Sequence, residues 1–161
     1  MRKSVEWVIN KYQKNLLVAA YSILKNKENA KDVVQDSFIK YYTLNKDYVD
    51  EEHIRAWLLR VTINRAKDVK KSFWHRFKTD DSISEKSNVT YVHNEEYGGL
   101  IDAVMELPEK YRVVIHLYYY EDLKIKEISS ILRITETNVK VRLTRGREML
   151  RIKLGEDWQN D

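Results

Sequence analysis

The chain has 161 residues, 43% of them hydrophobic, and its 29 Lys and Arg outnumber its 25 Asp and Glu to give a net charge of +4. It contains no cysteine, which excludes disulfides and thiolate metal sites and is typical of the reducing cytoplasm, so we expect a cytoplasmic protein. Its single Pro and four Gly are too few for the turns of a β-sandwich and favour an all-α protein. Neither a signal peptide nor an 18-residue apolar run is present, so we expect no insertion into a membrane.

The charge is distributed in three blocks. Residues 1–78 carry 17 Lys and Arg against 9 Asp and Glu, residues 79–109 carry 1 against 8, and residues 110–161 carry 11 against 8. Two basic blocks separated by an acidic block suggest two modules that face nucleic acid and a distinct connector between them.

The first two predicted helices cover residues 4–25 and about 30–44, with Asn29 as the candidate N-cap of the second. Near the start of the second helix, Asp32, Gln35 and Asp36 form a polar, partly acidic patch. The helix dipole stabilises acidic side chains in a first turn, so the patch could be purely structural. It could equally be a docking surface for a basic partner, and the residues alone do not decide between these interpretations.

A polar loop over residues 46–52 precedes a third predicted helix over residues 53–76. The first half of this helix has one apolar face, from Ile54 to Val61. From residue 65 to residue 78 there are six Lys and Arg, one acidic residue, and the aromatic residues Phe73 and Trp74. Basic side chains can follow phosphates while aromatic rings and planar amides receive an unstacked base. Asn64 lies where the apolar face gives way to the basic segment, although a surface Asn is most often only solvated.

Residues 79–97 have no periodicity and include the polar run DDSISEKSNV, which indicates a flexible connector. Beyond a further helix that ends near residue 107, apolar residues at helical spacing predict a short helix over residues 125–132. A break at residues 133–135 follows, and Thr135 can cap a longer basic helix. A short helix, a tight turn and a basic second helix form the helix-turn-helix plan, in which the second helix enters the DNA major groove. The alternative is a solvated cationic face on an ordinary amphipathic helix.

Four segments of the chain, in this order, resemble the small extracytoplasmic-function group of the sigma-70 family of RNA polymerase sigma factors. They are AKDVVQDSFIKYY, RAWLLRVTINRAKD, LPEKYRVVIHLYYYEDLKIKEIS and ITETNVKVRLTRGREML. The resemblance implies an all-α chain of two small helical domains joined by a flexible linker, the C-terminal domain being a helix-turn-helix. The expected boundaries are 1–76 for polymerase docking and −10 recognition, 77–97 for the acidic linker, and 98–155 for −35 recognition. The implied partners are core RNA polymerase and promoter DNA, with an anti-sigma factor as a further partner of many family members.

The resemblance also implies three groups of site residues. The residues expected to bind core polymerase are Asp32, Gln35, Asp36 and Phe38. Asn64 matches the position that helps recognise an everted base, and the residues expected at the −10 element are Asn64, Arg65, Lys67, Lys70 and Lys71. The residues expected at the −35 element are Lys140, Val141, Arg142, Thr144, Arg145 and Arg147, with Arg142 and Arg147 assigned to phosphates.

Two residues depart from the family pattern. Arg133 stands in the turn where Gly is expected, and a left-handed backbone there would cost on the order of 1–2 kcal/mol. Gly146 replaces a frequent Ala and would cost the helix roughly 1 kcal/mol.

Two other functions compete with the sigma-factor interpretation. A stand-alone helix-turn-helix regulator would leave Asn64 and the acidic patch without a role. A metal-dependent nucleic-acid-processing enzyme could use Asp32 and Asp36, but no third ligand lies at motif spacing. We therefore expect no catalytic residue, metal or cofactor.

Overall fold

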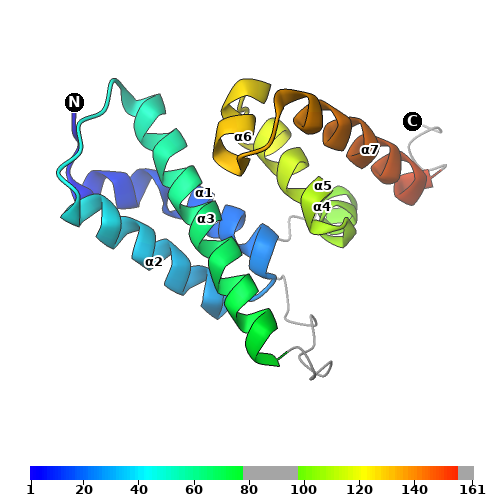
Figure 1. Cartoon of the computed structure of the whole chain (residues 1–161), viewed down its shortest axis with the longest axis horizontal. Coiled ribbons are helices and arrows are strands. Elements are labelled where there is room, and N and C mark those ends of the chain that lie inside the picture. The colour runs from blue at the N-terminus through cyan, green and yellow to red at the C-terminus, as the bar shows by residue number, and fades with distance from the viewer. Residues whose placement is uncertain (78–97, 156–161) are drawn as a thin grey trace. The chain divides into compact units, whose positions relative to one another are not determined.

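The computed structural model describes residues 1–77 and 98–155, which form two compact helical units, one from each range (Figure 1). No strand occurs in these described ranges, so the predicted all-α class is confirmed. The predicted linker over residues 77–97 lies outside them, apart from its first residue. None of the described helices is both long and apolar enough to cross a membrane.

The first unit consists of α1 (Val5–Leu24), α2 (Lys27–Thr43) and α3 (Glu51–Phe77). All three helices pack against one another around an apolar core. The fully buried side chains include Leu16, Tyr21, Ile23, Tyr41, Ile54, Leu58, Leu59 and Ile63. A hydrogen bond between side chains also lies in this core, where the Thr62 hydroxyl donates to Ser37 Oγ at 2.9 Å and so joins α3 to α2.

The N-cap of α2 is Asn26, so the prediction of Asn29 was wrong. Asn26 has an extended backbone, and its side-chain oxygen accepts a hydrogen bond from the backbone N–H of Asn29 at 2.9 Å. Lys25 ends α1 in the left-handed conformation, which turns the chain within two residues and brings the cap position forward. Asn29 therefore lies in the first turn, where its N–H is one of the donors that the cap satisfies.

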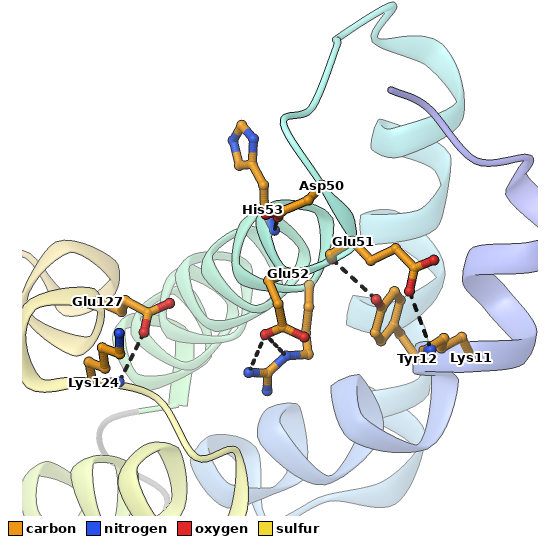
Figure 2. A network of polar contacts seen from close by, with 9 residues as sticks. Lys11, Tyr12, Asp50, Glu51, Glu52, His53, Lys124 and Glu127 are labelled. Carbon is orange, nitrogen blue, oxygen red and sulfur yellow. Dashed lines mark hydrogen bonds and ion pairs between the residues drawn. The ribbon is translucent and has the colours of Figure 1, made fainter.

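The helix α3 begins at Glu51, two residues before the predicted start. The Asp50 carboxylate accepts a hydrogen bond from the His53 N–H at 2.8 Å, as an N-cap does. The Tyr12 hydroxyl of α1 donates to the Glu51 carbonyl at 3.2 Å, and Lys11 lies 3.5 Å from the Glu51 carboxylate (Figure 2). These contacts anchor the start of α3 on α1.

The second unit consists of α4 (Gly98–Glu106), α5 (Glu109–Ile115), the π-helical turn η2 (His116–Tyr120), α6 (Ile125–Leu132) and α7 (Glu136–Leu154). The helix α7 packs against α4, α5 and α6. Its inward residues Val139 and Leu143 are buried, whereas Leu150 is only half-buried. The start of α6 is closed by the Glu127 carboxylate, which accepts from the Lys124 N–H at 3.0 Å (Figure 2).

The turn between α6 and α7 is left-handed at Arg133. Its φ of 57° and ψ of 44° lie in the region that favours Gly, so the strain that the sequence left open is present. The Ile134 N–H donates to the Ser129 carbonyl at 3.2 Å and helps to offset the strain at Arg133. Thr135 is the N-cap of α7, and its hydroxyl oxygen accepts from the Asn138 N–H at 3.0 Å. The helix-turn-helix plan is therefore present in the structure.

Candidate nucleic-acid interface

The acidic face of α2 consists of the exposed side chains of Asp32, Gln35 and Asp36. They line a hollow between α2 and α3, together with Asn29, Val33, Arg65 and Val69. Phe38, predicted to bind with them, is only 7% exposed and supports α2 from the core side. Three of the four predicted docking residues are thus accessible to a partner.

Arg65 connects the acidic face to the segment predicted to bind DNA. Its Nε lies 3.3 Å from Asp36 Oδ2, and both side chains are about half exposed, at 51% and 49%. Asp36 is predicted to bind polymerase and Arg65 to bind the −10 element, so the ion pair joins residues from two predicted sites. The positive charge beside Asp36 is therefore the Arg65 guanidinium. No group of three side chains that could hold a metal ion occurs in the described parts of the chain.

One side of α3 carries a stripe of four side chains, Arg60, Asn64, Lys67 and Lys71. We call this stripe the strand face, because three of its residues are among those predicted to bind the unpaired DNA strand of the −10 element. Their spacing of four, three and four residues places them on one side of the helix, opposite the buried Leu58 and Thr62. Arg60 and Lys71 are exposed, and Asn64 is half-buried among them.

Two residues of the predicted −10 group lie away from the strand face. Arg65 turns toward α2, as described above. Lys70 Nζ donates to the Ile23 carbonyl at 3.4 Å, near the C-terminus of α1, where a cation stabilises the helix end. The structure therefore unites Asn64, Lys67 and Lys71 but not the whole predicted set.

Sequence reasoning missed two residues of this face, Arg60 and Trp57. Trp57 is half-buried, lies seven residues before Asn64, and has its ring 5.8 Å from that of Tyr48. By helical spacing Trp57 shares the side of Asn64, whereas Phe73 lies on the opposite side of α3. Spacing counted backward from Asn64 would have found both residues, because a face of α3 continues across the boundary between its apolar and basic segments.

The recognition face of α7 consists of Thr137, Lys140, Val141, Thr144 and Arg145, all exposed. It lies opposite the buried side that contains Val139, Leu143 and Gly146. Thr137 was not among the predicted residues, although its position four residues before Val141 places it on the same side.

Two further arginines of α7, Arg142 and Arg147, are held by neighbouring side chains. Arg142 Nε donates to the Asn138 side-chain oxygen at 3.2 Å. The Arg147 guanidinium lies 5.7 Å from the ring centre of Tyr118 and 5.5 Å from that of Tyr119, and it donates to the Tyr119 hydroxyl. Both are thereby held at the sides of α7.

Two titratable side chains of the second unit, Tyr111 and His116, have shifted pKa values. A hydrogen bond from Arg145 lowers the pKa of the Tyr111 hydroxyl of α5. His116 of η2 is buried, stacks on Tyr120 at 4.9 Å, and has a pKa lowered to about 4 because burial disfavours its charged form. His116 is thus a neutral structural residue at ordinary pH.

Comparison with known proteins identifies both units. The family model "Sigma-70 region 2" matches residues 8–76, and "Sigma-70, region 4" matches residues 98–150. The RNA polymerase sigma factor SigV of Bacillus subtilis strain 168 is 30% identical to this chain over 92% of its length and 90% of that of SigV. The chain belongs to the extracytoplasmic-function group of the sigma-70 family.

Other relatives and solved structures agree with this assignment. The extracytoplasmic-function sigma factor SigM of the same strain is 29% identical to this chain, over 92% of this chain and 93% of SigM. The extracytoplasmic-function sigma factor SigW of that strain is 28% identical, over 91% of this chain and 87% of SigW. The sigma factor RpoE of Bartonella quintana, solved with the anti-sigma factor NepR, shares the fold with a TM-score of 0.77 at 18% identity, over 92% of this chain and 95% of RpoE. CnrH, solved with the cytosolic domain of CnrY, shares it with a TM-score of 0.64 at 22% identity, over 93% and 86% of the two chains.

Proposed function

We propose that this sigma factor docks on core RNA polymerase through the acidic face of α2 and recognises promoter DNA with both units. The observation that carries the proposal is that each unit presents an exposed basic helix face, on α3 and on α7, in a chain that belongs to a sigma-factor family. A repressor that binds only duplex DNA would need the second face but not the first.

The recognition face of α7 would read the −35 duplex. A helix fits the major groove, where each base pair presents a distinct pattern of donors, acceptors and methyl groups. Lys140 and Arg145 would donate to base edges, and Arg142 and Arg147 at the sides would contact phosphates. Because phosphate contacts release counterions, this part of the affinity should fall with salt.

The strand face of α3 would hold the unpaired −10 strand. Arg60, Lys67 and Lys71 would neutralise phosphates, and Asn64 offers an amide that both donates to and accepts from a base edge. Trp57, two turns before Asn64 on the same side of α3, would supply an aromatic surface for stacking. Everting a base costs a few kcal/mol, which these contacts and polymerase docking together would offset.

The chain would act in the cytoplasm as a specificity factor with no catalytic residue, metal or cofactor of its own. The chemistry of transcription would belong to the polymerase. The structure of RpoE, which has the same fold, was solved in complex with an anti-sigma factor. We propose that an anti-sigma factor also binds this chain.

Asn64→Ala tests the proposal against a stand-alone regulator. With core polymerase, this variant should bind polymerase and −35 duplex like the unchanged chain but form fewer open complexes, measured by permanganate reactivity of unpaired thymines. On templates mismatched in advance at the −10 element, the defect should shrink because the unpairing cost is already met. Asn10→Ala, an exposed Asn on α1, is the matched control and should open promoters normally. Normal opening by Asn64→Ala on paired templates would contradict strand capture at this position.

A further inference from the structure

The recognition face of α7 has an apolar centre. Val141 is 40% exposed, with Thr137 four residues before it and Thr144 three residues after it. This spacing aligns the three side chains along the outward side of the first half of α7. The basic residues Lys140 and Arg145 flank this row, so any groove that they enter must meet the row as well.

The chemistry that this row can offer to DNA is restricted. The Thr144 hydroxyl donates to the Lys140 carbonyl at 3.0 Å, one turn back along the helix. The hydroxyl hydrogen is therefore already donated within α7, and the methyl group of Thr144 can contact an apolar partner. Val141 has no polar atom at all. Two of the three side chains of this row, Val141 and Thr144, thus have a methyl group and no free hydrogen-bond donor to offer to a base.

We propose that Val141, with the methyl groups of Thr137 and Thr144 beside it, reads the 5-methyl group of a thymine in the −35 duplex. Thymine is the base that presents a methyl group in the major groove, and small apolar side chains are its usual partners. The proposal rests on the proposed function, because it requires α7 to lie in the groove. It makes Val141 a specificity-determining residue and names the base that it selects.

The size of the effect follows from the area of one methyl group. Removing a single buried methyl contact lowers affinity about fourfold, from the transfer free energy of one methylene-sized group. Replacing thymine by uracil removes that methyl and leaves the hydrogen-bonding edge unchanged, so the two bases isolate the contact.

The test uses the full chain with core polymerase on duplexes selected from a random promoter library. Each thymine of the −35 region is replaced in turn by uracil, and the affinity is compared among the unchanged chain, Val141→Ala and Ile152→Ala. Ile152 is an exposed apolar residue about three turns further along α7 and serves as the matched control. We expect uracil at one position or more to weaken the unchanged chain and Ile152→Ala about fourfold, but to leave Val141→Ala unaffected.

Two results would overturn the proposal. One is that no thymine-to-uracil change affects the unchanged chain. The other is that the uracil penalty is the same in Val141→Ala, which would mean that another residue contacts the methyl group. A complex that selects no −35 sequence would instead refute the proposed function itself, so the two failures are distinguishable.

Discussion

Replacement of Gly146 by Ala sets helix propensity against packing at the centre of the second unit. A Cβ atom at residue 146 would lie 3.0 Å from Ile115 Cγ1, 3.1 Å from Ile115 Cδ1 and 3.6 Å from Tyr111 Cβ. Optimal carbon–carbon contacts are about 3.5–4.0 Å, so the new methyl would overlap the Ile115 side chain. Ile115 is 4% exposed and has little room to move aside.

The two opposing effects have comparable sizes. Ala in a helix interior is favoured over Gly by about 1 kcal/mol, whereas overpacking a core costs about 1–3 kcal/mol. We therefore expect Gly146→Ala to lower the free energy of unfolding by about 1 kcal/mol. Ile115→Ala removes both clashing atoms, so in that background Gly146→Ala should instead stabilise the protein, by up to about 1 kcal/mol.

Urea denaturation of the four chains in this double-mutant cycle measures the coupling. Hydrogen exchange of the α5 and α7 amides assigns the change to the second unit, because two units need not unfold together. Gly99→Ala in α4 is the control, since a Cβ there meets no atom within 4 Å and should not destabilise. If Gly146→Ala stabilised the unchanged chain, or had the same effect with Ile115 present and absent, close packing at Gly146 would be refuted.

The remaining predictions concern charge. Burial lowers the pKa of His116 from 6.5 to about 4, so the unfolded chain binds one more proton than the folded chain between these pH values. The free energy of unfolding should therefore fall by roughly 3 kcal/mol as the pH falls from 6.5 toward 4. His116→Phe should flatten this part of the stability–pH curve from urea titrations, and an unchanged slope would contradict the burial argument. Asp36→Arg should weaken binding to core polymerase in a fluorescence anisotropy assay without unfolding the chain, because the exposed pair with Arg65 is worth at most about 1 kcal/mol. The charge swap Asp36→Arg with Arg65→Asp restores an ion pair but should leave polymerase binding weak, and recovered binding would mean that Asp36 acts only through that pair.

Local features of the chain were determined by sequence alone. Thr135 caps α7 and α6 spans residues 125–132, as predicted, because a cap and a short helical face depend on residues within about four positions. The resemblance in four segments also identified the family from the sequence. The cap of α2 was predicted three positions too late, at Asn29 instead of Asn26, since two Asn side chains offer the same chemistry and the left-handed Lys25 decides between them.

The tertiary structure decided what depends on residues far apart in the chain. Gly146 appeared from sequence as a weak point of α7, but its missing side chain lets α7 approach Ile115 closely. Arg65 and Lys70 appeared to belong with Asn64, but packing of α3 on its neighbours directs one to Asp36 and the other to the end of α1. Helical spacing reveals which residues share a side of a helix, whereas only the packing of the helices determines what each side meets.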